Sequence, residues 1–532
     1  MKRYFLSVSL MACISVVVAQ SKDASVKYAS IITGENLKKQ LTIIASDEME
    51  GRETGTEGQR KAAAYIESQF KAIGLKPVAA LNGYQQLYPL YKASMKTSVV
   101  KIDGKELQYG TDYYVSITNN GDKAENADKI VFAGYGIADS VYDDYKGLDV
   151  TGKVVVIFLG EPKKDGKYLL SGSDLYSKYT YPGLATKIKI AKKKGAAGAI
   201  ILNPSAASDS ISSNVVKANT NADVTYPNKL ESDGLNYIVL APGFAKTLFA
   251  DWGMDSLLKS AKAFTPFTAS SVAAKTASYS FDYKKEKVPV NASNVLGIIE
   301  GTDKKDEYVF LTAHYDHLGK KGDKIYYGAD DDGSGTCAVI NMAQAFAKAK
   351  ADGKGPRRTI VFMTVSGEEK GLWGSKYYSD NPVFPIDKTS VDLNTDMVGR
   401  VDTERTTDDS LNYVYVIGHD KLSSELPIIN EGVNKKYTNL VLDYKFDDPN
   451  DRQRIYYRSD HYNFARKGIP ILFFYDGMLK ADYHKPTDTV DKINWELYEK
   501  RTRMIFHTAW EMANRNDMLK RDIPLPGAGD DD

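Results

Sequence analysis

Five side chains of the types that bind metal ions lie in the second half of this 532-residue chain: His314, Asp331, Glu369, Asp396 and His484. Each stands in its own short motif, namely AHYDH, GADDDGSGT, SGEEKG, NTDMVG and DYHKPTDT. Two imidazoles and three carboxylates can hold two zinc ions side by side if one carboxylate bridges them. Ions about 3.5–4 Å apart stabilise the attacking and leaving atoms of a hydrolysis. The set points to metal-assisted hydrolysis of an acyl bond.

Two of these motifs carry a second polar residue with its own chemistry. If one ring nitrogen of His314 binds a metal, Asp316 can accept the proton on the other nitrogen. Glu368 and Glu369 follow the apolar segment TIVFMTVS. One of the two glutamates can bind metal while the other acts as a general base, which takes a proton from water and passes it to the leaving amine.

Each motif alone has a plain structural interpretation. Asp396 could cap a helix, and His484 could be a surface histidine. Three consecutive aspartates around Asp331 are usually a solvated loop, but at the mouth of a sheet their repulsion needs a cation to offset it. The occurrence of all five motifs in one part of the chain favours a common site.

The elements that must position these residues form an alternating pattern from residue 291 onward. Apolar segments such as YVFLTAH, TIVFMTVS, VDLNTDM and IPILFFY alternate with helical patterns at residues 334–350 and 371–379. This alternation predicts an α/β/α sandwich around a mixed, largely parallel sheet. His314 and Asp396 end two predicted strands, at the edge where such sheets bind ligands.

The remaining chain divides by its patterning. We expect a signal peptide at residues 1–20, an N-terminal segment of the catalytic domain at 21–96, an inserted β-rich domain at 97–288, the catalytic domain at 289–520 and a flexible tail at 521–532. The first segment carries helical spacing that stops at Gly74. The insert has short β-type segments separated by turn residues, with a serine- and asparagine-rich stretch at 206–222 expected to be a loop.

The first twenty residues decide the expected location. Lys2 and Arg3 precede a short apolar segment that ends in a Val-Val-Ala sequence typical of signal-peptidase cleavage, so we expect a secreted or periplasmic protein. A minor alternative is lipid attachment at Cys13, which follows Leu-Met-Ala. No other segment reaches eighteen apolar residues, so stable membrane insertion is not expected. A net charge of +1 without a basic stripe argues against nucleic-acid binding.

The order and the residues of these motifs resemble those of the M28 family of zinc peptidases with two metal ions, chiefly its aminopeptidase branch. Residues 41–77 are similar to the family's N-terminal segment, and the segments at 131–137, 142–158 and 191–202 are similar to its protease-associated (PA) domain. The resemblance implies the zinc exopeptidase fold with an inserted PA domain.

The resemblance also implies roles for single residues. Asp331 would bridge two zinc ions, with His314 and Asp396 completing one site and Glu369 and His484 the other. It further implies Glu368 as general base, Asp316 as the residue that orients His314, and Tyr483 as a hydrogen-bond donor to the oxyanion.

A second matching segment, YRSDHYNF, makes Tyr457, Asp460 and His461 candidates for substrate contact. The other three histidines, His317, His419 and His507, are interpreted as structural.

The sequence is therefore interpreted as a secreted aminopeptidase with two zinc ions per chain, acting on peptides. Two alternatives stay open. One is a related carboxypeptidase or dipeptidase, which differs in the pocket that meets the free terminus. The other is a non-catalytic protein that binds partners through its PA domain, against which the complete ligand set and Glu368 argue. The sequence leaves the oligomeric state open.

Overall fold

The computed structural model describes residues 23–117, 119–227, 234–406 and 411–525. The expected signal peptide with Cys13, and residues 526–532 of the tail, lie outside the described residues. The chain forms two compact units, one built from residues up to Tyr88 and from Ala292 onward, the other from Pro89–Asn291. The chain passes between the units inside two long strands, β1 (Gln85–Ile102) and β11 (Lys275–Ile299), close to the expected boundaries at 97 and 288.

The first unit is built on a mixed sheet. Its strands, in spatial order, are β18 (Val441–Asp443), β17 (Tyr413–Ile417), β19 (Ile471–Tyr475), β16 (Thr389–Thr395), β12 (Lys304–His314), β15 (Arg358–Val365) and the end of β11. Neighbours β19, β16, β12 and β15 run parallel, as do β17 and β18, whereas β17–β19 and β15–β11 are antiparallel. The predicted α/β class with a largely parallel sheet is confirmed.

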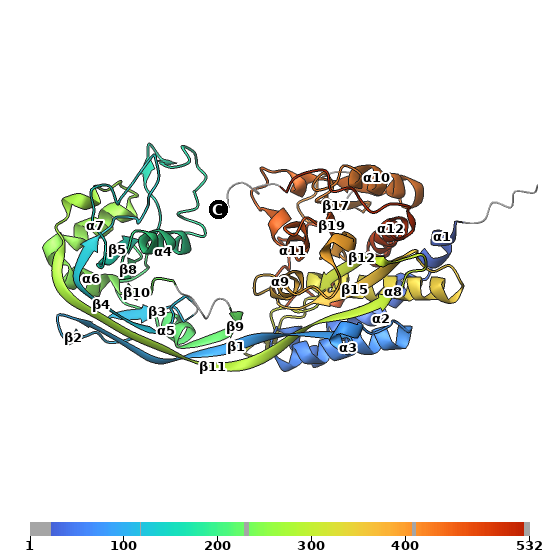
Figure 1. Cartoon of the computed structure of the whole chain (residues 1–532), viewed down its shortest axis with the longest axis horizontal. Coiled ribbons are helices and arrows are strands. Elements are labelled where there is room, and N and C mark those ends of the chain that lie inside the picture. Colours follow the sequence, from blue (N-terminus) through green and yellow to red (C-terminus); the bar gives the residue numbers. More distant parts are fainter. Residues whose placement is uncertain (1–22, 118, 228–233, 407–410, 526–532) are drawn as a thin grey trace, which may run out of the picture. The chain divides into compact units, whose positions relative to one another are not determined.

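Helices cover both faces of this sheet (Figure 1). They include α8 (Gly335–Ala351), α9 (Trp373–Asp380), α10 (Leu426–Tyr437), α11 (His461–Ala465) and α12 (Trp495–Asn514). The N-terminal helices α1 (Ala24–Ala29), α2 (Gly34–Ile44) and α3 (Glu57–Ile73) pack on α8 or α12. Helix α3 ends at Gly74, whose φ of 84° is the left-handed conformation that glycine adopts readily, as the sequence predicts.

Aromatic contacts show which helix lies on which face. The ring of Phe310 in β12 packs against Tyr378 of α9 and Phe464 of α11, with each pair of centroids 5.5 Å apart. The next residue of β12, Leu311, is paired with Phe362 of β15. The ring of Phe362 contacts Phe346 of α8. Because adjacent strand residues point to opposite faces, α9 and α11 cover one face and α8 the other.

In the second unit, β4 (Lys123–Phe132), β5 (Val154–Phe158), β8 (Gly198–Leu202) and β10 (Tyr237–Leu240) run parallel, with β3 (Tyr113–Val115) antiparallel at the edge. Strand β4 also pairs antiparallel with β11, so these strands continue the same hydrogen-bonded sheet. Its helices are α4 (Leu184–Lys193), α5 (Ser213–Thr220), α6 (Pro242–Leu248) and α7 (Met254–Lys262). Strands β2 (Lys105–Glu106) and β9 (Asn221–Thr225) pair with β1.

The expected loop at residues 206–222 is wrong in its second half. Helix α5 and the start of β9 lie there. Ser212 accepts the backbone N–H of Val215 at the start of α5, which is how a serine starts a helix rather than a loop.

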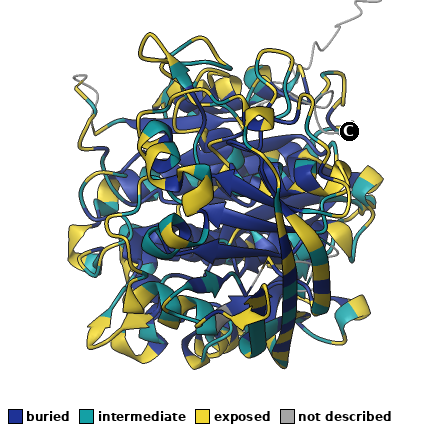
Figure 2. Cartoon of the chain, turned by 90° about the vertical axis from the view of Figure 1, so that its left-hand side faces the viewer, coloured by how far each residue is buried: buried dark blue, intermediate teal, exposed yellow. Residues whose placement is uncertain are grey.

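The parallel strands of both units are buried on their two faces. In β5, Val154, Val156 and Phe158 join one apolar cluster of the second unit, while Val155 and Ile157 join another. Figure 2 shows the central strands in the buried colour, whereas the long strands alternate between buried and exposed residues. Burial on both faces is the usual state of parallel strands.

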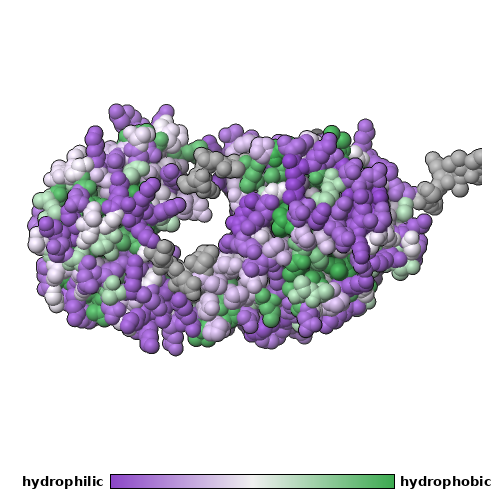
Figure 3. All heavy atoms as spheres, viewed as in Figure 1, coloured by the Kyte–Doolittle hydropathy of each residue, from purple (hydrophilic) through white to green (hydrophobic). Residues whose placement is uncertain are grey.

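The surface is mostly hydrophilic on the face seen in Figure 3. Among the residues that the structure describes, no helix is long and apolar enough to cross a membrane.

Candidate metal centre

The motif residues meet at one edge of the first unit's sheet. His314 is the last residue of β12, Asp396 follows β16, the glutamates follow β15, Asp331 precedes α8, and His484 lies in the loop after β19. Because β15, β12, β16 and β19 are parallel neighbours, their C-terminal ends lie together. The sheet therefore brings residues from five distant segments to one place.

The first group of donors surrounds the ring of His314. Its Nε2 atom lies 3.3 Å from Oδ1 of Asp331 and 3.6 Å from Oδ1 of Asp396. All three residues are buried.

A second group shares Asp331 with the first. The Nε2 atom of His484 lies 3.2 Å from Oδ2 of Asp331 and 3.0 Å from Oε2 of Glu369. Asp331 thus presents one carboxylate oxygen to each group.

These groups fit zinc by distance and by chemistry. Bonds of about 2.0–2.1 Å in a tetrahedron place two ligand atoms roughly 3.3 Å apart, close to the 3.0–3.6 Å seen here. Nε2 of His314 and Oδ2 of Asp331 are buried and have no hydrogen-bond partner among the described residues. Buried polar atoms normally have partners, and a cation would supply one here.

His317 belongs to this site, although the sequence analysis interprets it as structural. It is fully buried, and its Nδ1 lies 2.7 Å from Oε1 of Glu369. That ion-pair distance is short for two ligands of one zinc ion, although donor atoms of His317, Asp331 and Glu369 lie close enough together to hold a metal ion. His317 holds one oxygen of Glu369, while the other oxygen faces His484. In the sequence, the feature that could have indicated this role is that His317 stands three residues after His314 in the motif AHYDH.

The two imidazoles lie in strongly negative surroundings. Burial lowers the pKa of His314, but the carboxylates of Asp396 and Glu368 outweigh it and raise the pKa well above its ordinary value. Burial likewise lowers the pKa of His484, and the two carboxylates beside it raise the pKa to about 10. Without a metal, the protons on these rings offset the carboxylate charge. A metal ion would take over that task.

Glu368 lies beside the first donor group without being part of it. Its Oε2 atom is 3.9 Å from Nε2 of His314. Burial raises the pKa of Glu368 well above its ordinary value, and the nearby charges of Glu369 and Asp396 add to the effect. A carboxylate with raised proton affinity in this place is suited to proton transfer.

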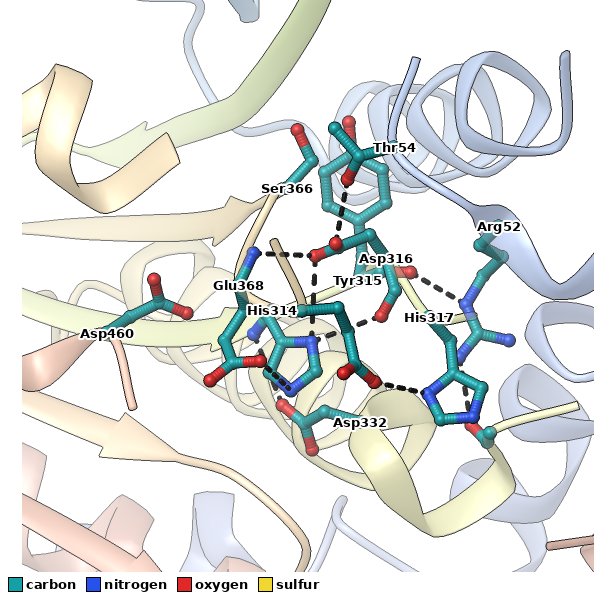
Figure 4. A network of polar contacts seen from close by, with 12 residues as sticks. Arg52, Thr54, His314, Tyr315, Asp316, His317, Asp332, Ser366, Glu368 and Asp460 are labelled. Atoms are coloured by element: carbon teal, nitrogen blue, oxygen red, sulfur yellow. Dashed lines mark hydrogen bonds and ion pairs between the residues drawn. The ribbon is translucent and has the colours of Figure 1, made fainter. Parts of the chain in front are cut away.

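Asp316 connects three segments of the site (Figure 4). Its carboxylate accepts hydrogen bonds from the Thr54 hydroxyl at 2.7 Å and from the Glu368 backbone N–H at 3.2 Å. The carboxylate lies 3.7 Å from Nδ1 of His314, whereas the backbone carbonyl of Asp316 lies 3.1 Å from it. The nearer contact for the His314 ring is thus the backbone oxygen of Asp316, while its side chain holds the turn that carries Glu368.

Sequence reasoning missed Arg52, which lies fully buried behind the site (Figure 4). Its guanidinium donates to the backbone oxygens of Tyr315 at 2.6 Å and Gly328 at 2.9 Å, and also to those of Ile44 and Tyr327. A buried charge is tolerated when its donors are used in this way. In the sequence, one arginine in a glycine-rich acidic loop is typical of a solvated surface, so no signal marked it.

Two more buried aspartates hold the ligand-bearing loops. Asp332 accepts the backbone N–H groups of His314 at 3.2 Å and Met397 at 3.0 Å. Asp488 accepts the backbone N–H of Asp331 at 3.1 Å. The turns that carry the donors are therefore fixed to one another through backbone hydrogen bonds.

A pocket of about 340 Å³ opens beside the donors. Its lining consists of Asp331, Glu368, Asp396, Arg458, Ser459, Tyr483 and the less polar Met397, Ile455, Phe473, Tyr475 and Leu479. The ring of Tyr483 stacks on His484, with centroids 3.8 Å apart, and its hydroxyl lies 3.2 Å from Nη2 of Arg458. The predicted oxyanion donor thus lines the pocket.

The candidates for substrate contact lie elsewhere. Asp460 and His461 are fully buried and do not line the pocket. His461 contacts the backbone oxygen of Tyr456 and stacks on Phe473, and burial lowers its pKa to about 4. Tyr457 packs against another tyrosine outside the lining. Within this segment, Arg458 and Ser459 reach the pocket because the chain turns there.

The other two histidines lie outside this centre. His419 pairs with Asp447, whose carboxylate also holds the ammonium group of Lys421, so its charge is already offset. His507 stacks on Tyr437, with centroids 4.0 Å apart.

Comparison with known proteins adds family evidence to this geometry. Residues 294–509 match the family model described as peptidase family M28, and residues 113–234 match that of the PA domain. A probable zinc metalloprotease of Leptosphaeria maculans is 35% identical over 118 residues, which cover 21% of this chain and 25% of the relative. A probable leucine aminopeptidase of Trichophyton verrucosum is 26% identical over 226 residues, 41% of this chain and 57% of the relative.

The chain thus spans between a quarter and three fifths of the length of these relatives. Among solved structures, an aminopeptidase from Aneurinibacillus sp. strain AM-1 superposes with a TM-score of 0.52, covering 94% of this chain and 99% of that chain. At 18% identity this likeness shows the fold.

The contact between His317 and Glu369 generates a prediction about metal affinity. Replacing His317 by Phe frees one oxygen of Glu369, so zinc affinity should fall by roughly 10- to 100-fold, the usual cost of losing a partner of a ligand. His507→Phe, which changes another largely buried histidine far from the donors, is the control. Competition with a zinc chelator measures both. Equal affinities in the two variants would contradict the assigned contact.

Proposed function

We propose that this chain, whose residues 294–509 match the model of peptidase family M28 and whose residues 113–234 match that of the PA domain, is a zinc-dependent aminopeptidase. One observation carries the proposal. Asp331 presents one oxygen to the group of His314 and the other to the group of His484, beside a pocket that also contains Glu368.

We propose two zinc ions per chain. His314, Asp331 and Asp396 would hold one, and Asp331, Glu369 and His484 the other. When bound, the ions lower the pKa of water and polarise the scissile carbonyl group.

The protein's own residues handle the protons. Glu368 takes a proton from the attacking water on its carboxylate and passes it to the nitrogen of the leaving amine. The Tyr483 hydroxyl donates a hydrogen bond to the oxygen that gains negative charge. Asp316 fixes the turn that carries Glu368 through the backbone N–H of that residue.

The carboxylates that line the pocket suit a substrate with a free amino group. Carboxylate oxygens of Asp396 and Glu368 can accept hydrogen bonds from an N-terminal amino group beside the reacting bond. This favours release of N-terminal residues over a non-catalytic role. Export through residues 1–20 is part of the same proposal, because an exported peptidase needs such a leader.

Replacing Glu368 by Gln tests the proton transfer. The amide cannot accept a proton, so kcat should fall by about 10²–10⁴-fold while zinc content stays unchanged. Glu496→Gln, an exposed change in α12, is the control. Steady-state kinetics and metal analysis are the measurements. Loss of zinc, or a kcat within tenfold of wild type, would refute the role of Glu368.

The class of peptidase is tested by blocking the substrate's N-terminus. Acetylation removes the free amino group that donates hydrogen bonds to the pocket carboxylates, so the acetylated form of a short peptide should not be cleaved while the free form is. Mass spectrometry of the products identifies which end is shortened. Efficient cleavage of the acetylated peptide, or release of its C-terminal residue, would support the carboxypeptidase alternative instead.

A further inference from the structure

The pocket beside the donors contains one cationic side chain among its lining residues, that of Arg458. The charged residues that share the pocket are Asp331, Glu368 and Asp396, all acidic. An arginine in such a place is either paired with a carboxylate of the protein or available to a ligand. The contacts of Arg458 decide between these possibilities.

Arg458 forms no ion pair with a carboxylate within the described parts of the chain. Its one hydrogen bond there runs from Nη2 to the hydroxyl of Tyr483 at 3.2 Å, and its side chain is exposed. A guanidinium group has five N–H donors in a planar fork that matches a carboxylate. Most of these donors are therefore free to meet a ligand in the pocket.

The backbone that carries Arg458 is firmly held. The next residue, Ser459, is buried and accepts a hydrogen bond from Asn394 of β16 at 2.9 Å. The residue after it, Asp460, is fully buried and accepts the hydroxyl of Ser375. Because the backbone is already ordered, binding has to order the side chain of Arg458 alone, which suits recognition.

We propose that Arg458 binds a carboxylate group of the substrate, so that the site prefers peptides with a negative charge close to the scissile bond. This inference rests on the proposed function, because it names the substrate of the same pocket. Asp331 and Asp396 are assigned to the zinc ions, so Arg458 is the lining side chain left to meet a substrate carboxylate. Because Arg458 lines the same pocket as Asp331, Glu368 and Asp396, the carboxylate belongs to the first or second residue.

Two sources offer such a carboxylate. One is the side chain of an N-terminal aspartate or glutamate, and the other is the free C-terminus of a dipeptide. Both present the same group to the guanidinium fork. A different role, in which Arg458 only supports the hydroxyl of Tyr483, would affect every substrate equally.

Binding to a variant that does not turn over separates these cases. In the zinc-loaded Glu368→Gln protein, calorimetry compares leucyl-leucine with leucyl-leucinamide, and glutamyl-leucinamide with glutaminyl-leucinamide. The same pairs are measured after adding Arg458→Met, Arg458→Lys or, as a control, the exposed change Arg452→Met. Methionine keeps the apolar stem of the side chain and removes its charge.

The proposal predicts that the carboxylate member of at least one pair binds about 10- to 100-fold more tightly than its neutral partner. Arg458→Met should abolish that preference and leave the neutral member within about threefold, whereas Arg458→Lys should keep part of it and Arg452→Met all of it. The pair that shows the preference identifies the source of the carboxylate. No preference in the parent protein, or an unchanged preference in Arg458→Met, would overturn the proposal.

Turnover by protein with intact Glu368 distinguishes carboxylate binding by Arg458 from mere support of the Tyr483 hydroxyl. Arg458→Met should leave kcat for leucyl-leucinamide within about threefold. A large fall in kcat on this neutral peptide would overturn the proposal in favour of support for Tyr483. If the wild type cleaves none of these peptides, the proposed function fails, while the binding ratios still decide the role of Arg458.

Discussion

The repulsion among carboxylates packed at one sheet edge is the constraint on which the rest of the site depends. Asp331, Glu368, Glu369 and Asp396 converge on two imidazoles in a place largely closed to water. Like charges so close cost free energy unless cations offset them. The directions of the pKa shifts express this cost, since the neighbouring carboxylates raise the pKa of His314 and burial raises the pKa of Glu368. Two bound cations would relieve the repulsion directly.

Such a site needs a rigid frame, and the structure builds it from buried polar groups. The guanidinium of Arg52 ties the backbone beside His314 to the turn before Asp331, and Asp332 ties His314 to the turn after β16. Asp316 holds the turn that carries Glu368 by accepting the backbone N–H of that residue. Because these contacts are made to backbone atoms, they fix the backbone position from which each donor side chain extends. Once the backbone is fixed, only the few rotatable bonds of each side chain can move its donor atoms away from the centre.

The donors could be predicted from the sequence, whereas their supports could not. His314 and Asp396 directly end or follow apolar strands, and parallel strands place their C-terminal ends together, so local patterning predicts that these two residues lie close to each other. Arg52 is separated from His314 by more than 260 residues, and only the packing of the N-terminal segment shows that they are neighbours. Arg458 and the buried Asp460 stand two residues apart in one motif, and their opposite exposure depends on a turn. The unit boundaries fall inside β1 and β11, where strand patterning continues without a break.

The sharing of Asp331 between two donor groups is the central claim, and a zinc titration of metal-free protein tests it most directly. Calorimetry on the wild type should show two zinc equivalents per chain, and His484→Ala should remove one of them. Asp331→Ala should weaken both, because each ion loses a ligand and the charge between them disappears. A single equivalent in fully active wild-type protein, or two tight equivalents in Asp331→Ala, would contradict the account.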